Sequence, residues 1–137
     1  MKKFIISIDA GTTSNRAILF DLKGKPVFSS QKEFTQYFPK SGWVEHNPEE
    51  IWSTTKKVLK DVISKARKLR GKVLAIGITN QRETTVLWNK KTGKPVYRAI
   101  VWQDRRTANL CENLKRKGID KKIQKITGLE LDPYFSA

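Results

Sequence analysis

Residues 5–21 read IISIDAGTTSNRAILFD: an apolar strand, a short turn of glycine and hydroxyl residues, and a second apolar strand. Gly11 allows the backbone to approach an anion closely, because a side chain there would collide with it. The turn amides and the hydroxyls of Thr12 and Thr13 could donate to phosphate oxygens. Asp9 could hold Mg²⁺ through water. The same residues also fit an ordinary β-hairpin with a polar turn, so both interpretations stay open.

Three predicted strands open the chain, at residues 3–9, 16–21 and 26–34. The connection 22–25 is short and polar, and such a connection makes neighbouring strands antiparallel. A further apolar run at 73–79 follows a long crossover, which favours parallel pairing with the first strand. Composition and spacing alone therefore indicate a mixed α and β domain.

A long amphipathic helix is predicted between the third strand and this last run. Asn47 suits its N-cap, Pro48 suits its first position, and two glutamates follow in the first turn. Apolar residues recur at helical spacing as far as Leu69, and we expect Gly71 to stop the helix. The predicted order of elements is β-β-β-α-β.

The rest of the chain predicts two more strands and two short helices. The strands are expected at 84–88 and 96–102 with a turn at 89–95, and the helices at 105–117 and 119–126. No internal repeat, low-complexity tract or linker interrupts the 137 residues. We therefore expect a single domain with one core.

The chain is strongly basic, with 28 basic and 13 acidic side chains and a formal net charge of +15. Clustered positive charge is all that phosphate-backbone binding requires, so a noncatalytic nucleic-acid-binding module is one alternative. The basic residues concentrate, however, on or beside the predicted helices, at 56–72 and 115–125. Since no nucleic-acid module pattern is present, we interpret them as solvated helix faces and do not expect a nucleic-acid partner.

The chain has one cysteine and one histidine. Cys111 cannot form an internal disulfide, which agrees with a reducing compartment, and we interpret it as a core filler of its helix. His46 precedes the helix cap, where we expect a packed or solvent-facing ring, and alone it makes no tight zinc site. The sequence shows neither a bilayer-spanning apolar run nor a signal-peptide core. We therefore expect a cytoplasmic protein.

Five separated segments of the chain resemble one family. DAGTTSNR at 9–16 resembles the first phosphate motif of the actin, Hsp70 and sugar-kinase superfamily. The other segments are GWVEHNP at 42–48, ITNQRETT at 78–85, WQDRRT at 102–107, and TGL with DPYFSA between 127 and 137. Together, and in this order, they resemble the glycerol kinases among the FGGY carbohydrate kinases.

This resemblance implies an RNase H-like (actin-like ATPase) mixed sheet, which agrees with the predicted β-β-β-α-β order. Because glycerol kinases are several times longer, we interpret residues 1–137 as an amino-terminal fragment of FGGY kinase domain I. The family's catalytic base, second phosphate loop and adenosine pocket are then expected beyond Ala137. We expect the isolated fragment to be inactive.

The resemblance implies a function and a set of site residues for the full-length protein. The function is ATP-dependent phosphorylation of glycerol to sn-glycerol 3-phosphate, in glycerol catabolism, by a homo-oligomer that uses ATP and Mg²⁺. The residues implied for the nucleotide phosphates are Thr12, Thr13, Ser14 and Arg16, with Asp9 for the metal. Those implied for glycerol are Arg82, Glu83, Trp102 and Tyr134. An FGGY kinase for another polyol or sugar is the nearest alternative.

The residues themselves also bear on the acceptor site. Arg82 and Glu83 follow a predicted parallel strand directly, at the end where ligands of open α/β sheets bind. Arginine donates a fork of hydrogens and glutamate accepts two, which matches adjacent hydroxyl groups. A loop salt bridge or a charge at the strand edge is the alternative for this pair, and a core position is the alternative for Trp102.

Overall fold

The computed structural model describes residues 1–135, and the chain divides into two compact units. The first, called here the sheet unit, consists of residues 1–35 and 47–81. The second, called the loop unit, consists of residues 36–46 and the chain from Arg82 onward. Each unit brings together segments that are distant in sequence.

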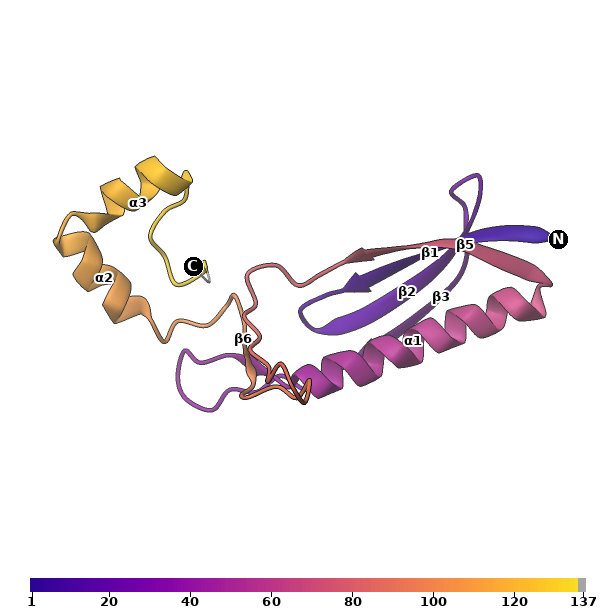
Figure 1. The fold of residues 1–137 in the computed structure, drawn as a ribbon, viewed down its shortest axis with the longest axis horizontal. Helices are drawn as coiled ribbons and strands as arrows, with labels where there is room; N and C mark the ends of the chain where they lie inside the picture. The colour runs from indigo at the N-terminus through magenta and orange to yellow at the C-terminus, as the bar shows by residue number, and fades with distance from the viewer. Residues whose placement is uncertain (136–137) are drawn as a thin grey trace. The chain divides into compact units, whose positions relative to one another are not determined.

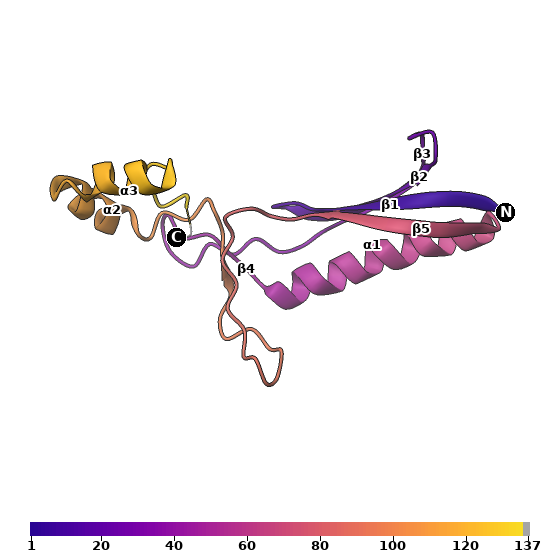
Figure 2. The ribbon, with the colours of Figure 1, turned by 45° about the horizontal axis from the view of Figure 1, so that its top comes forward.

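The sheet unit is a four-stranded mixed sheet with one long helix along one face (Figures 1 and 2). The strand order is β3-β2-β1-β5, with β1 antiparallel to β2 and parallel to β5. The elements are β1 (Lys2–Ala10), β2 (Ser14–Asp21), β3 (Pro26–Glu33), α1 (Pro48–Lys68) and β5 (Gly71–Thr79). The predicted mixed α/β class and its β-β-β-α-β order are confirmed; a two-residue strand of the loop unit, β4, precedes α1 in the chain.

The start of α1 follows the predicted capping chemistry. Asn47 has extended backbone dihedrals, and its Oδ1 accepts a hydrogen bond of 3.0 Å from the backbone N–H of Glu49. Pro48 occupies the first turn together with the acidic Glu49 and Glu50, whose charge favours the positive end of the helix dipole. The long crossover through α1 returns the chain to the sheet parallel to β1.

The core of the sheet unit lies between the sheet and α1. Alternate residues of β1 and β2 point toward the helix, as the period of two in a strand requires. The buried apolar residues are Phe4, Ile6, Ile8, Ala17, Leu19, Val58, Val62 and Ala66. Burying a large apolar side chain of this kind stabilises the fold by about 1.5–3 kcal/mol.

The prediction that Gly71 stops the helix is wrong. The helix ends at Lys68, and Arg70 adopts the left-handed backbone conformation, with φ of 54°. Gly71 is instead the first residue of β5, where a Cβ atom would lie 2.1 Å from Cε2 of Phe4. The glycine is required by this close packing of β5 against an aromatic ring of β1.

The loop unit has little regular structure. It contains β4 (Glu45–His46), β6 (Ala99–Ile100), α2 (Ala108–Arg116) and α3 (Ile119–Thr127), with β4 antiparallel to β6. The predicted helix at 119–126 is confirmed by α3. The helix predicted at 105–117 begins later, at Ala108, because Asp104 accepts the backbone N–H of Arg106 and holds a turn there.

The strands predicted at 84–88 and 96–102 are wrong except at β6. Elsewhere in these two segments the backbone pairs only through isolated bridges, of Thr85 with Ile100 and of Trp88 with Pro95. The apolar side chains that suggested strands are mostly exposed: Leu87, Trp88, Val96 and Tyr97 have exposed fractions of 57% to 67%. Only Ala99 and Val101 of these segments are buried, which is too short a buried face to fix the register of a continuous ladder.

The single cysteine and histidine lie where the sequence predicts packing roles. Cys111 is a free, buried residue of α2. His46 is fully buried, and its Nε2 lies 2.6 Å from Oε1 of Gln36, which confirms the packed alternative. In the described part of the chain, every helix is too short or too polar to cross a bilayer.

Candidate functional site

The turn between β1 and β2 is tight and leaves little space for a side chain at Gly11. The backbone N–H of Gly11 donates to the Ser14 carbonyl at 3.0 Å, and a Cβ atom on Gly11 would lie 3.0 Å from that oxygen. Gln81, just beyond β5, donates from Nε2 to the Gly11 carbonyl at 3.0 Å. The turn is therefore fixed at the edge of the sheet where the parallel strands β1 and β5 end.

The hydroxyl residues of the turn differ in their surroundings. Thr13 is exposed and Thr12 is partly buried. The Ser14 hydroxyl accepts a hydrogen bond of 2.8 Å from Nε2 of Gln31 on the neighbouring strand. Three of the four residues predicted for phosphate binding, Thr12, Thr13 and Ser14, thus lie together in or beside one turn.

Asp9 and Arg16 face each other across β1 and β2. Their side chains form an ion pair of 3.0 Å and are 43% and 45% exposed. An exposed pair contributes only about 0–1 kcal/mol, so breaking it would cost the fold little. Among residues 1–135 no cluster of three or more potential ligands could hold a metal directly. A single carboxylate that binds through water still fits Mg²⁺, which keeps much of its hydration shell.

Asn15, at the end of the turn, links β2 to α1 through its side chain, and the sequence analysis missed this link. Its side chain is fully buried and donates to Oγ1 of Thr54 at 2.6 Å and to the Ile51 carbonyl at 2.9 Å. Both partners belong to α1. A buried polar residue immediately after a phosphate-type turn is the signal that could have indicated this link.

Arg82 and Glu83 follow Gln81 in the chain and begin the second part of the loop unit. Within residues 1–135, no side chain forms an ion pair with either of them, so the predicted alternative of a loop salt bridge is wrong there. Arg82 is exposed, and Glu83 has a left-handed φ of 58°. Such a backbone conformation costs about 1–3 kcal/mol in a residue other than glycine and is common at functional sites.

Trp102 and Tyr134 come together in the loop unit. Their rings meet edge to face, with centroids 5.5 Å apart and an interplanar angle of 60°. Phe135 packs in the same manner on the other side of Tyr134, with centroids 5.0 Å apart. Trp102 is partly buried and Tyr134 is 38% exposed. The structure therefore joins two of the four predicted acceptor residues into one aromatic surface.

Asp132 holds the backbone of Tyr134. Its Oδ1 accepts hydrogen bonds of 2.8 Å from the Tyr134 N–H and from Nη1 of Arg105. The hydrogen bond from Tyr134, together with the Arg105 guanidinium, keeps the pKa of Asp132 below its ordinary value. The sequence analysis assigned no role to Asp132, although it lies in one of the family-like segments.

Two buried carboxylates, an arginine and a tryptophan form a cluster close to Trp102 in the chain, and we call it the Arg106 cluster: Trp43, Glu45, Asp104 and Arg106. The side chains of Glu45 and Asp104 are only 1% and 3% exposed. Nη2 of Arg106 lies 2.8 Å from both Oε1 of Glu45 and Oδ2 of Asp104. Its guanidinium also stacks over the Trp43 ring, 3.8 Å from the centroid. Arg106 therefore pairs with both buried carboxylates, and Arg98, 3.8 Å from Glu45, supplies a second positive charge.

The electrostatics of the Arg106 cluster follow from these contacts. Burial alone would raise the pKa of Asp104, but hydrogen bonds from Arg106 and from the Val44 backbone outweigh it and lower that pKa. The same carboxylates raise the pKa of Arg106, chiefly through the hydrogen bond with Asp104. Asp104 accepts the Val44 N–H at 2.7 Å, and the Val101 N–H donates to the Val44 carbonyl at 3.1 Å. The segment that carries Trp102 is thereby fixed to Val44, the residue before β4.

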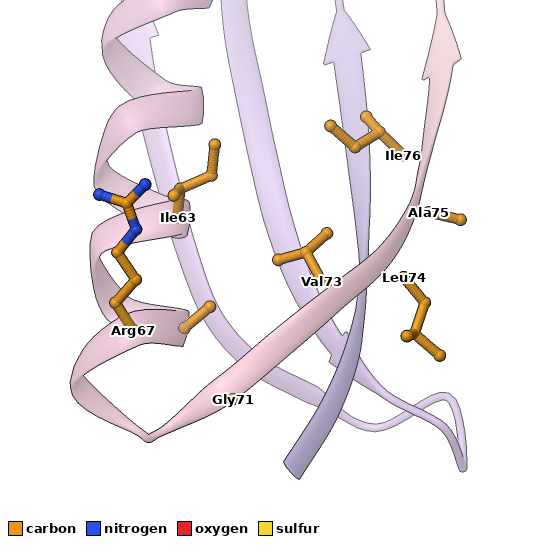
Figure 3. Close-up of a pocket in the computed structure, with 8 residues that line it drawn as sticks. Ile63, Arg67, Gly71, Val73, Leu74, Ala75 and Ile76 are labelled. Atoms are coloured by element: carbon orange, nitrogen blue, oxygen red, sulfur yellow. The ribbon is translucent and has the colours of Figure 1, made fainter. Parts of the chain in front are cut away.

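A separate hollow of about 540 Å³ lies in the sheet unit, between α1 and β5 (Figure 3). Ile63 of the helix and Val73 of the strand face it, and Arg67 is its one charged lining residue. No residue predicted for nucleotide or acceptor binding lines it. The hollow lies along β5, which is an edge strand of the sheet. On this strand, the side chains of Ile76 and Ile78 are 45% and 73% exposed.

Solved structures similar to this chain are carbohydrate kinases. The glycerol kinase of Plasmodium falciparum with ADP superposes with a TM-score of 0.91 at 39% identity, over 99% of this chain and 27% of that one. The gluconate kinase of Lactobacillus acidophilus superposes with a TM-score of 0.88 at 26% identity, over 98% and 26% of the two chains. The fold is thus that of the actin-like sugar kinases, as predicted.

Sequence comparison gives the family. The model of the FGGY family of carbohydrate kinases, N-terminal domain, matches residues 4–137. A glycerol kinase of Petrotoga mobilis is 58% identical over 136 residues, which are 99% of this chain and 27% of that relative. A glycerol kinase of Thermoanaerobacter sp. is 60% identical over the same shares. The chain belongs to the FGGY family of carbohydrate kinases, and it spans about a quarter of the length of these curated relatives.

Proposed function

We propose that the whole protein transfers the γ-phosphoryl group of ATP to glycerol and forms sn-glycerol 3-phosphate. The observation that carries this proposal is 58% identity to a glycerol kinase along 99% of the chain. Identity to the solved gluconate kinase is 26%, so a larger acceptor is less well supported. Residues 1–137 are assigned to the amino-terminal part of the first kinase domain.

The turn between β1 and β2 is assigned to the nucleotide. Thr12, Thr13, Ser14 and Arg16 would bind phosphate oxygens, and Asp9 would hold Mg²⁺ through water. Neutralising the charge of the transferred phosphoryl group is the main electrostatic task in such a reaction. The tight backbone at Gly11 and the exposed Asp9–Arg16 pair support this assignment. The glycerol kinase of P. falciparum, solved with ADP, supports nucleotide use.

Arg82, Glu83, Trp102 and Tyr134 are assigned to the acceptor. Arg82 and Glu83 have no ion-pair partner among the described residues, so their hydrogen-bonding groups are available to hydroxyls. The aromatic edges of Trp102 and Tyr134 would cover the carbon chain of a small polyol. Polar side chains for the hydroxyls and aromatic rings for the carbon chain would together suit glycerol.

The proton acceptor for the hydroxyl and the adenosine site are assigned to the rest of the whole protein, because the relatives are about four times as long. The 137-residue polypeptide alone is therefore expected to form no ADP in the presence of glycerol. The whole protein is proposed to be a cytoplasmic homo-oligomer, and the single free cysteine supports a reducing compartment.

The test is a panel of acceptors with the whole protein, ATP and Mg²⁺, with ADP formation as the readout. We expect kcat/KM for glycerol to exceed the values for xylulose and gluconate by roughly 100-fold or more. A preference for either of the larger acceptors would overturn the assignment of glycerol. Salt-sensitive retention on DNA with no response to glycerol or nucleotide would support the noncatalytic alternative instead.

A further inference from the structure

Asp132 links two segments of the loop unit that are 27 residues apart in the chain. Its carboxylate accepts one hydrogen bond from Arg105, three residues after Trp102, and another from the backbone of Tyr134. Tyr134 in turn contacts the Trp102 ring. Arg105, Asp132 and Tyr134 therefore form a continuous series of contacts that leads back to Trp102.

The backbone between Asp132 and Tyr134 has little freedom. Proline fixes φ of residue 133, and it also restricts the residue before it to extended conformations. Once the Asp132 carboxylate is held by Arg105, the hydrogen bond to the Tyr134 N–H leaves few positions for the tyrosine ring. The ion pair of Arg105 with Asp132 is thus linked, through the backbone of Tyr134, to the contact between the Tyr134 and Trp102 rings.

We propose that Asp132 is a positioning residue for the acceptor: held by Arg105, it fixes Tyr134 against Trp102 and so sets the aromatic surface against which a small polyol binds. This inference rests on the proposed function, because it assigns an effect on the same acceptor site. Asp132 acts through Tyr134 and does not itself contact the acceptor.

The exposure of the pair argues against a role in overall stability. The side chains of Arg105 and Asp132 are 52% and 31% exposed, and exposed ion pairs stabilise a fold only weakly. Neither residue belongs to the buried apolar core. The consequence of breaking the pair is therefore expected in acceptor binding and not in folding.

The test is steady-state kinetics of the whole protein with Asp132→Ala. We expect KM for glycerol to rise about tenfold, since the aromatic surface loses its fixed position, while KM for ATP changes less than about twofold. Asp132→Asn keeps an oxygen that accepts the Tyr134 N–H but loses the charge that holds Arg105. Its KM for glycerol should rise only about threefold.

A matched control comes from α1 of the sheet unit. Lys57 and Asp61 form an ion pair of 2.6 Å with side chains 57% and 33% exposed, close to the exposure of Arg105 and Asp132. Asp61→Ala removes a similar ion pair that touches no aromatic residue of the acceptor site. Neither KM should change in this variant.

A double-mutant cycle separates positioning from a general structural effect. In a Tyr134→Ala background, Asp132→Ala should raise KM for glycerol no further, because the ring that it positions is gone. A further increase of the same size, or an equal rise in both KM values, would overturn the proposal. If the whole protein prefers another acceptor, the proposed function fails, but the same cycle with that acceptor still tests the role of Asp132.

Discussion

The two units of this chain are stabilised by different means. In the sheet unit, fully buried apolar residues such as Ile6 and Val58 fill the space between the sheet and α1. In the loop unit, buried carboxylates of Glu45 and Asp104 converge on Arg106. The first arrangement depends on area removed from water, whereas the second depends on complete pairing of charge.

This difference determines how each unit holds its candidate binding residues. The turn at Gly11 is fixed by backbone pairing of neighbouring strands, so its geometry depends on few particular side chains. Trp102 and Tyr134 lie in irregular segments and are fixed by side-chain contacts that involve Arg106 and Asp132. We therefore expect single polar substitutions to disturb the loop unit more than the sheet unit.

The largest effect is expected for Arg106→Ala. It leaves the buried Asp104 without its cation and Glu45 with only the more distant and exposed Arg98, and breaking a buried ion pair costs about 3–5 kcal/mol. Urea unfolding followed by circular dichroism measures the change. Arg98→Ala is the matched control: Arg98 lies 3.8 Å from Glu45 but is 45% exposed, and its loss should cost no more than about 1 kcal/mol. Similar losses for both arginines would contradict our account of the cluster.

A smaller effect, in the sheet unit, is expected for Gly71→Ala. The new methyl group would meet the Phe4 ring at 2.1 Å and force the strand or the ring to move, at a cost of about 1–3 kcal/mol. Gly77→Ala lies on the same strand, with no atom within 4 Å of the added carbon. Its free energy of unfolding should change by less than about 0.5 kcal/mol. Equal values for the two variants would show that β5 and β1 do not pack as described.

The smallest effect is expected in the pH dependence of the loop unit. The pKa of Asp104 is lowered on folding, so its ionised form contributes stability above the unfolded value of 3.8. That contribution is lost as the pH falls through the still lower pKa of the folded protein. Asp104→Asn should therefore flatten the loss of stability below about pH 4, measured as urea midpoints across that range.

Asp61 of the sheet unit provides the comparison for this titration. Its pKa is also lowered, first by the hydrogen bond from Lys57, but that pair is exposed and is screened by salt. At high ionic strength, Asp61→Asn should keep the acid sensitivity of the parent chain. If Asp61→Asn flattened the curve more than Asp104→Asn, the contrast between the two units would be wrong.

The sequence predicted the sheet unit well because its information is local and periodic. Alternating apolar residues in β1 and β2, and the cap at Asn47, specify strands and a helix without knowledge of their partners. The one error, at Gly71, arose because glycine serves two purposes: it permits a helix-ending conformation and also close packing. Only the position of the Phe4 ring distinguishes the two.

The loop unit was predicted less well because its structure depends on contacts that are distant in sequence. Residues 84–88 have the composition of a strand but bury too little apolar surface to form one. Glu45 and Arg106 are 61 residues apart, so local patterns gave no sign that they pair in a buried site. The resemblance named Trp102 and Tyr134 among the acceptor residues, whereas their ring contact and the hydrogen bonds of Asp132 are seen only in the structure.

The most direct test of the proposed function is steady-state kinetics of the whole protein with Glu83→Gln. Glutamine has nearly the shape of glutamate, but it is uncharged. Its NH2 group replaces one of the two oxygens that would accept hydrogen bonds from the acceptor hydroxyls. We expect KM for glycerol to rise at least about tenfold and KM for ATP to stay within about twofold. An unchanged KM for glycerol would contradict the assignment of Glu83 to the acceptor.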